Sequence, residues 1–230
     1  MFEPGEILSH TEMCAREGKN LQVGMHFKIA PTHSVMLMST RKGAPYADEV
    51  LDDGRVLVYE GHDLPRSDAV PDPKLVDQPL FSAKGTITQN GRFYQAGEKA
   101  RNGEAEAELV RVYEKIRPGI WVYNGLFRLI DAWQQASEGR LVCKYRLEAE
   151  DDELQENASA AEVEHTRVIP SEVKRTVWSR DRGRCVICGS GENLHFDHII
   201  PYSRGGSSLT AENIQLLCAK HNLEKRDRIV

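Results

Sequence analysis

The sequence lacks any long run of apolar residues. In its 230 residues, no window approaches the roughly 18 consecutive apolar positions that a transmembrane helix needs. The opening segment, MFEPGEILSHTEM, has no basic start followed by an apolar stretch, and so does not read as a secretory signal. We therefore expect a cytoplasmic protein with no membrane partner.

Cysteine is also scarce. There are five cysteines, an odd number, and a sparse and odd set in a chain without a secretory signal argues against a disulfide framework. Three of the five fall in the last 46 residues, which already suggests a metal site near the C-terminus.

The remaining composition is that of an ordinary folded protein. The chain is 40% hydrophobic and 28% charged, which excludes disorder over the whole length, and its size allows one or two domains. The net charge of −5 is unevenly spread, because residues 166–230 sum to +4 and the rest to −9. A basic tail on an acidic body fits contact with a polyanion at one end.

An acidic stretch without aromatic residues divides the chain. We predict a first domain over 1–147, a partly helical acidic linker over 148–165 and a second domain over 166–230. The first block mixes helix signals with a majority of strands, which favours an α+β or barrel-like domain. Helices are expected at 10–16 and 103–117, and strands at 33–38, 55–59, 120–123, 126–133 and 140–147.

Fewer elements are expected in the second block. A helix is predicted over 172–180, a strand over 194–199, a glycine-containing loop over 202–208 and a helix from 211 to about 226. In the first block, the run 84–103 reads equally as a loop entering a nucleic-acid groove or as a hairpin with a solvated tip.

The strongest chemical signal is a pair of metal-ligand motifs. Cys185 and Cys188 form a C-x-x-C pair, and Cys218 and His221 form a C-x-x-H pair 29 residues further on. Three thiolates and one imidazole can close a tetrahedral structural zinc site. Two readings remain beside it: unrelated thiol pairs in a core, or a role for His221 at a second, catalytic metal.

Between and after these pairs stand Asp-His-Ile-Ile-Pro, a Gly-Gly loop, Asn-Ile-x-Leu-Leu-Cys and Asn-x-x-Lys. Together they resemble the HNH nuclease family, whose fold is the ββα-metal module. Family members often carry a cysteine at the place of His221, and some carry a histidine at the place of Arg226. The resemblance implies a general base at His198, ligands for Mg²⁺ or Mn²⁺ at Asp197 and Asn222, a loop-orienting Asn213 and a phosphate contact at Lys225.

Several of these roles have plainer alternatives. His198 could be a structural histidine, and Asn213 could be only a helix cap. His195 could be a further metal ligand, since strand alternation places it on the face of Asp197.

The first block carries a second, more diffuse resemblance. Tyr123-Asn-Gly, with Pro45-Tyr-Ala-Asp-Glu-Val and Val58-Tyr-Glu-Gly upstream, looks like the SRA (YDG) family, which reads modified cytosine. The resemblance implies an SRA/PUA-like twisted β-barrel. It also implies a flipped base between Tyr46 and Tyr59, with Glu49, or alternatively Asp48, accepting from its exocyclic amine. The plain reading is that both tyrosines are ordinary strand residues.

Together these features predict an α+β protein that is a modification-dependent endonuclease. It would flip 5-methylcytosine or 5-hydroxymethylcytosine in double-stranded DNA and hydrolyse a nearby phosphodiester. Cutting both strands with one active site per chain suggests a homodimer or repeated nicking. The alternatives are an HNH nuclease aimed at unmodified DNA or RNA by another kind of domain, and a non-catalytic protein that only binds modified DNA.

Overall fold

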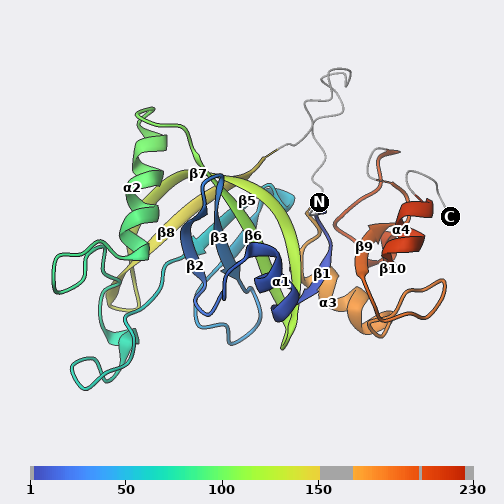
Figure 1. The fold of residues 1–230 in the computed structure, drawn as a ribbon, viewed down its shortest axis with the longest axis horizontal. Helices are drawn as coiled ribbons and strands as arrows, with labels where there is room; N and C mark the ends of the chain where they lie inside the picture. The colour runs from blue at the N-terminus through green and yellow to red at the C-terminus, as the bar shows by residue number, and fades with distance from the viewer. Residues whose placement is uncertain (1–2, 151–167, 202–203, 226–230) are drawn as a thin grey trace.

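Two units of unequal size make up the part of the protein that can be described (Figure 1). The structure is a computed structural model, and it describes residues 3–150, 168–201 and 204–225. Most of the expected acidic linker lies outside these ranges. In chain order the elements are β1 (Ile7–Ser9), α1 (His10–Glu17), β2 (Met25–Ala30), β3 (His33–Met38), β4 (Glu49–Leu51), η1 (Asp52–Gly54), β5 (Val56–Glu60), η2 (Pro73–Leu75), α2 (Gln89–Arg101), β6 (Glu108–Arg117), β7 (Ile120–Ser137), β8 (Arg140–Ala149), α3 (Ser171–Arg180), β9 (Leu194–His198), η4 (Ala211–Asn213), β10 (Ile214–Cys218) and α4 (Ala219–Lys225).

The larger unit is built on one mixed sheet. Its strand order is β2-β3-β6-β7-β8-β5-β4, with β1 paired to β7 off this path. The β3–β6 pair is parallel, and the other pairs are antiparallel. The chain is therefore α+β, as expected. Among the described residues the pairing runs from β2 to β4 without closing, so the expected barrel is not confirmed.

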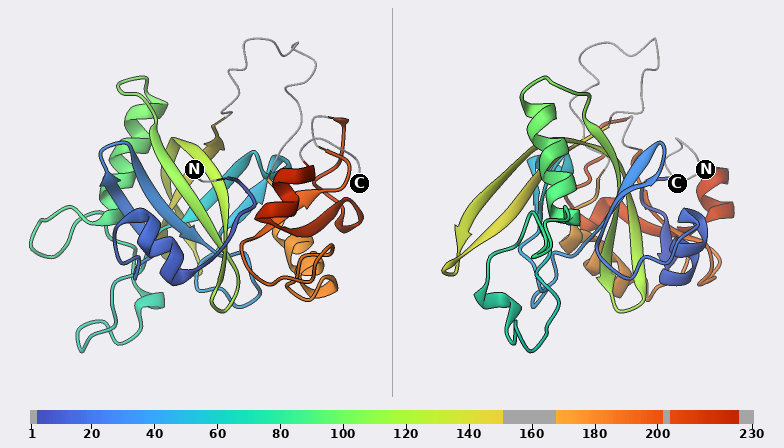
Figure 2. Two further views of the ribbon diagram at one scale, coloured as in Figure 1. Left: turned by 45° about the vertical axis from the view of Figure 1, so that its right-hand side comes forward. Right: turned by 60° about the vertical axis from the view of Figure 1, so that its left-hand side comes forward.

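Helix α2 packs against the sheet, as the right-hand view of Figure 2 shows. Thr88 caps its start by accepting a hydrogen bond from the Gly91 N–H. Gly97 allows the close approach to β7, because a Cβ there would come within 2.7 Å of the Ala132 Cβ. Phe93 reaches from this helix into a core that includes Met36, Leu57, Phe127 and Tyr145.

Three sequence predictions of local structure are wrong. The run 84–103 contains α2 rather than a loop or a hairpin, and 103–117 contains β6 rather than a helix. Glu104 and Glu106 raise helix propensity there, but Val110, Val112 and Tyr113 are buried in a strand that lies between β3 and β7 in the sheet. Likewise, the helix predicted from 211 is η4, then strand β10, then the short α4.

The N-terminal segment joins the two units. Strand β1 pairs with β7, and just before it the Gly5 N–H donates to the Tyr123 carbonyl while the Gly5 carbonyl accepts from the Phe196 N–H. Glu6 forms a bridge with His195 in β9. Gly5 has φ +90, and a Cβ there would lie 2.9 Å from the Phe196 oxygen, so this crossing requires glycine. Hydrogen bonding thus continues from the large sheet into the small one.

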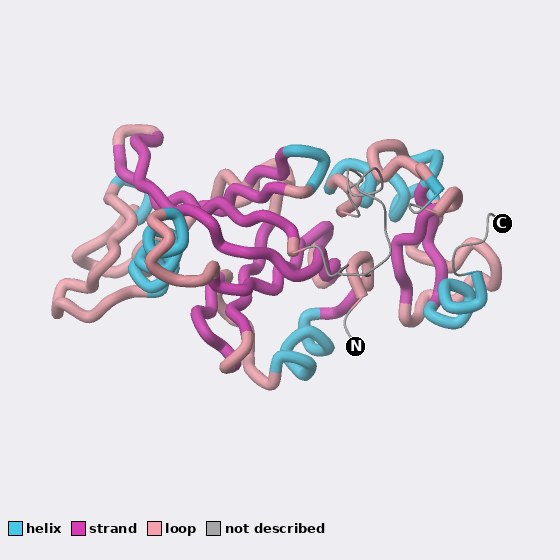
Figure 3. The backbone as a smooth tube through the Cα atoms, turned by 90° about the horizontal axis from the view of Figure 1, so that it is seen from above, coloured by secondary structure: helices cyan, strands magenta, loops and turns pink. Residues whose placement is uncertain are grey.

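The smaller unit places two antiparallel strands beside helices, the ββα arrangement that the HNH resemblance implied (Figure 3). Its core is shared with the larger unit, because Ile116 and Val122 from β6 and β7 belong to the same buried cluster as Val173, Phe196 and Leu216. Helix α3 covers 171–180, close to the predicted range.

Candidate functional site

Four ligand atoms converge in the smaller unit. They belong to Cys185, Cys188, Cys218 and His221 and lie within 4.8 Å of one another. Cys188 Sγ is 3.9 Å from Cys218 Sγ, and His221 Nδ1 is 3.4 Å from Cys185 Sγ and 3.3 Å from Cys218 Sγ. A tetrahedral zinc ion with Zn–S bonds of about 2.3 Å places two sulfurs about 3.8 Å apart, and sulfur and nitrogen about 3.5 Å apart. The predicted ligand set therefore fits zinc in number, chemistry and spacing.

Local backbone structure builds this cluster. Cys185 and Cys188 lie in a tight turn in which the Gly189 N–H donates to the Cys185 carbonyl, while Cys218 ends β10 and His221 lies in α4. Burial raises the pKa of the Cys185 thiol, but backbone donors of Cys188, Cys218 and Ile187 outweigh it and lower the pKa to about 6. The turn therefore favours the thiolate that a zinc ion binds.

His198, the predicted general base, is the last residue of β9. Its Nε2 lies 2.8 Å from Ser208 Oγ, in the loop between the two strands. A proton on Nε2 that is donated to this hydroxyl leaves the lone pair of the neutral ring on Nδ1. Sequence reasoning missed Ser208, because a serine in a serine- and glycine-rich loop carries no distinguishing signal.

The carboxylate of Asp197 is held by two neighbours. Gln215 Nε2 donates to Oδ2 at 3.0 Å, and Lys225 Nζ lies 3.0 Å from the same oxygen and 3.4 Å from Oδ1. Lys225 Nζ also donates to the His198 carbonyl at 2.5 Å. The Lys225 side chain is only 2% exposed, so the structure does not show the expected phosphate contact. The ammonium points inward because Asp197 and a strand carbonyl complete its hydrogen bonds.

Asn213 ties down the loop that follows β9. Its Oδ1 accepts from the Ile200 N–H at 2.8 Å, and its Nδ2 donates to the carbonyls of Ser207 and Ile200 at 2.9 and 3.2 Å. These three bonds are more than a helix cap would make. They connect Asn213 to both ends of the loop between β9 and η4.

Asn222 lines a cavity of about 150 Å³ together with Glu3, Glu6 and His195. His195 and Asp197 are two apart in β9 and share a face of the strand. Asp197 itself does not line this cavity. A carboxylate and an amide oxygen are hard donors of the kind that Mg²⁺ and Mn²⁺ prefer, so the expectation for Asp197 and Asn222 depends on the chemistry of their donor atoms. Burial lowers the pKa of His195, and Glu6 and Glu3 oppose this shift.

A second, larger cavity of about 390 Å³ opens in the larger unit. Two of the four residues predicted for the base pocket line it, Tyr46 and Asp48. Asp48 accepts hydrogen bonds from the Ser39 N–H at 2.9 Å and the Glu60 N–H at 3.0 Å. Burial raises the pKa of Asp48 to about 7, against the effect of these two donors. Near neutral pH this carboxyl can therefore either donate or accept a proton.

On the side of the cavity, the aromatic ring of Tyr46 contacts the side chain of Lys74. Lys74 Nζ lies 4.4 Å from the ring centroid and lines the cavity, whereas His62 stacks on Tyr46 at 4.9 Å and does not line it. Burial lowers the pKa of His62 to about 4, so the ring is neutral at pH 7. An incoming base can stack on Tyr46 only after the lysine moves aside.

The other two predicted pocket residues lie elsewhere. Tyr59 is buried in the core, where its hydroxyl donates to the Gly24 carbonyl at 3.1 Å and contacts His62 Nε2 at 2.9 Å. Glu49 is an exposed residue of β4. Neither lines the cavity, so of the two acidic candidates the structure brings Asp48 rather than Glu49 to Tyr46.

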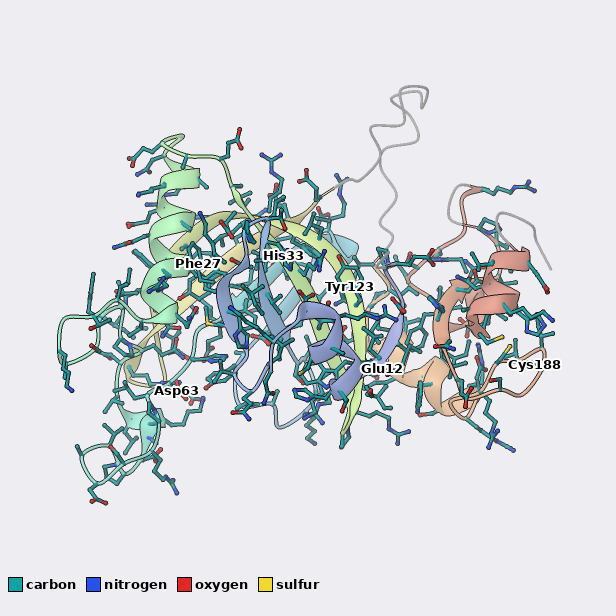
Figure 4. All side chains as sticks on the ribbon, viewed as in Figure 1. Glu12, Phe27, His33, Asp63, Tyr123 and Cys188 are labelled. Carbon is teal, nitrogen blue, oxygen red and sulfur yellow. The ribbon has the colours of Figure 1, made fainter. Side chains whose placement is uncertain are left out.

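Ion pairs stiffen the cavity wall. Arg140 Nη1 lies 2.6 Å from Asp63 Oδ1, Lys74 Nζ lies 2.9 Å from Asp63 Oδ2, and Lys144 Nζ lies 3.0 Å from Glu60 Oε2. No sequence pattern indicated this network, because its members are spread over residues 60–144. Asp63 and Cys188 of the metal cluster lie toward opposite ends of the molecule (Figure 4).

A buried polar cluster lies between the two units. Lys174 Nζ of α3 is 2.9 Å from Glu114 Oε2 and 2.5 Å from Asn124 Oδ1, and Asn124 Nδ2 donates to Glu114 at 3.3 Å. Asn124 is the middle residue of the Tyr-Asn-Gly motif. Burial raises the pKa of Glu114, but Lys174 and the hydrogen bonds around it outweigh this and hold the pKa below its usual value.

Comparison with known protein families identifies the C-terminal segment. Residues 185–228 match the family described as HNH endonuclease, a range that holds the four cluster ligands, Asp197 and His198. The chain thus carries an HNH endonuclease segment, as the motifs indicated. No curated protein matches the chain.

Solved structures similar to this chain include two kinds of protein. An SRA domain of SUVH5 in complex with hemimethylated CG DNA is 24% identical, with a TM-score of 0.45 over 66% of this chain and 90% of that chain. The modification-dependent TagI restriction endonuclease is 19% identical, with a TM-score of 0.46 over 97% of this chain and 77% of that chain.

Within the described ranges, none of the helices has the length and apolar character needed to cross a membrane.

Proposed function

We propose that this chain is a DNA endonuclease that reads a modified cytosine in its larger unit and cuts the backbone with its HNH segment. The proposed nuclease activity is supported by the HNH match and by one arrangement: adjacent residues of β9, Asp197 and His198, place a carboxylate and a histidine on opposite faces of the strand that pairs with β10. The proposed recognition of modified cytosine is supported by the charged cavity that Tyr46 and Asp48 line.

At the cutting site, His198 is the general base. Its neutral imidazole accepts a proton from the water that attacks the scissile phosphate, and Ser208 fixes the ring. Asp197 and Asn222 would hold a Mg²⁺ or Mn²⁺ ion, which supplies charge neutralisation at the phosphate. Asn213 orients the loop after β9, and zinc at the Cys₃His cluster maintains the segment's fold.

At the reading site, a cytosine swings out of the duplex and stacks on Tyr46. Extrusion costs a few kcal/mol, which contacts in the pocket must offset. The carboxyl of Asp48 faces the same cavity and can accept from the exocyclic amine or, when protonated, donate to the ring nitrogen. 5-Methylcytosine and 5-hydroxymethylcytosine are the bases we propose.

The two sites are far apart in the molecule, so the cut falls away from the modified base. The residue 5–9 segment and the Lys174–Glu114 pair connect the units without an intervening flexible joint in the described ranges. One cutting site per chain cleaves a duplex either by successive nicks or as a homodimer on double-stranded DNA, and we propose the homodimer.

The test uses one amplified duplex prepared with cytosine, 5-methylcytosine or 5-hydroxymethylcytosine, each incubated with Mg²⁺ or Mn²⁺. We expect cutting of the modified duplexes only, and none by the His198→Ala variant. Equal cutting of all three duplexes would retain the nuclease and remove the modified-base reader. Binding of modified DNA without hydrolysis in either metal would instead indicate a non-catalytic binding protein.

A further inference from the structure

Lys225 stands out because a lysine ammonium is buried where the sequence predicted an exposed phosphate contact. Burying a charge is costly unless the charge is paired and its hydrogen bonds are made. Among the residues that the structure describes, the ammonium contacts the carboxylate of Asp197 and the carbonyl of His198. The two residues that the proposed chemistry uses are therefore both in contact with one cation of the protein itself.

The contacts on Asp197 are uneven. Oδ2 lies 3.0 Å from Gln215 Nε2 and 3.0 Å from Lys225 Nζ, whereas the Lys225 contact to Oδ1 is longer, at 3.4 Å. The carboxylate side chain is only 13% exposed, so without a nearby cation it would be a poorly solvated negative charge. The lysine supplies that cation and fixes the carboxylate by its Oδ2 edge, which leaves Oδ1 the less engaged oxygen.

We propose that Lys225 is a positioning residue that serves as the resident counter-cation of Asp197, and that it does not contact DNA phosphate. It neutralises the carboxylate and engages mainly Oδ2, so that Oδ1 is the oxygen that would be available to a divalent ion. The inference builds on the proposed function, because it takes Asp197 as a ligand of the catalytic ion.

The first test is thermal unfolding of the full chain with zinc retained and no chelator present, with and without Mg²⁺. Lys225→Met removes the charge and keeps most of the side-chain volume. Without Mg²⁺ we expect the unfolding temperature to fall by about 5–15 °C, as for a broken buried pair. With Mg²⁺ the fall should be clearly smaller, because the added cation restores the charge balance at Asp197. An equal fall in both buffers would show a merely structural lysine and overturn the proposal.

The matched control is Lys220→Met. Lys220 lies on the same helix, with a side chain that is 75% exposed and only a loose pairing, 3.9 Å, with Glu224. The same neutral substitution there should leave both unfolding temperatures close to those of the parent protein. A Mg²⁺-dependent change of the same size in this control would mean that any lost lysine charge produces the effect, which would also overturn the proposal.

The second test separates a counter-cation from a phosphate contact. The affinity for a modified duplex is measured over a salt series without Mg²⁺. Loss of a phosphate contact lowers the slope of log affinity against log salt by about 1. We expect an unchanged slope for Lys225→Met, and a slope reduced by about 1 would contradict the proposal.

A double variant covers the case in which Lys225→Met does not fold. Asp197→Asn alone leaves the buried ammonium without its carboxylate, so Asp197→Asn/Lys225→Met should be more stable than either single variant. Additive losses would contradict the proposal. None of these readouts depends on DNA cutting, so a protein that failed to cut would refute the proposed function and leave the Lys225 result intact.

Discussion

Lys174 of the smaller unit and Glu114 of the larger unit form a buried ion pair, with Nζ and Oε2 2.9 Å apart and side chains 2% and 1% exposed. The pair lies beside Val122 and Val173, in the core that both units share. Asn124 completes it from the Tyr-Asn-Gly motif. The proposed reader and the proposed nuclease thus share one polar contact that cannot be broken without burying an unpaired charge.

This contact predicts a large loss of stability when one partner is removed. Lys174→Met should cost about 3–5 kcal/mol of unfolding free energy, because Glu114 remains buried and charged. Lys174→Met/Glu114→Gln should recover much of that loss. Denaturant unfolding of the parent, both single variants and the double variant measures the coupling. A double variant whose loss equals the sum of the single losses would contradict the account.

The Cys₃His cluster predicts tightly bound zinc that supports the smaller unit. Cys218→Ser should lose the metal and destabilise that unit, because the four ligands connect the turn at 185–189 to the end of β10 and to α4. Metal content per chain and near-ultraviolet circular dichroism are the measurements. Cys14→Ser, at a cysteine far along the chain from the cluster, should keep the zinc. Full zinc content in Cys218→Ser would refute the assigned ligand set.

Asp48 predicts a specific dependence of stability on pH. Its pKa is about 7 in the folded protein against 3.8 for the ordinary carboxyl, so the folded state binds more protons between these values. Its contribution to stability is therefore present below about pH 4 and is lost as pH rises to about 7. His62 has the opposite sign, since burial lowers its pKa from 6.5 to about 4 and its contribution grows over that interval.

Comparison of Asp48→Asn with the parent isolates the Asp48 effect. The amide cannot titrate. The unfolding temperature of the parent minus that of the variant should therefore decrease as pH rises from 4.5 to 7.5, whatever constant cost the substitution adds. Glu60 and Lys144, the charged groups near Asp48, are unchanged in both proteins. A gap that does not change with pH would show that the folded pKa of Asp48 is ordinary.

The position of Tyr46 in the cavity predicts that its ring stacks on the base and that its hydroxyl is not needed for this contact. Tyr46→Phe should bind modified DNA nearly as well as the parent, whereas Tyr46→Ala should lose about 1–3 kcal/mol of binding free energy. Binding of an unmodified duplex should change little in either variant. Competition binding with matched modified and unmodified duplexes measures this. Equal losses on both duplexes would place Tyr46 outside the reading site.

The sequence predicts the parts of this molecule that depend on local spacing. The C-x-x-C and C-x-x-H pairs bring their ligands together because each pair lies within one turn, and the adjacent Asp197 and His198 follow from strand alternation. The contact of Asn213 with the loop after β9 is also local, because Asn213 ends the same connection between β9 and β10.

The failures involve contacts between distant segments. Helix α2 lies where glycines lower helix propensity, yet Gly91 and Gly97 are what let it pack closely on its neighbours. No sequence pattern singled out Lys174 or paired Lys225 with Asp197, and only the folded chain shows the carboxylates that these lysines meet. Tyr59 matched the motif of a pocket residue, but it lies in the core rather than in the cavity.

The most direct test of the central claim uses a long duplex that carries a single 5-methylcytosine at a known position. If one rigid chain both reads the base and cuts the backbone, cleavage in Mg²⁺ will fall at a fixed distance from that base. The same duplex with plain cytosine will remain intact. Cuts scattered along the duplex, or equal cutting of the plain duplex, would contradict the account.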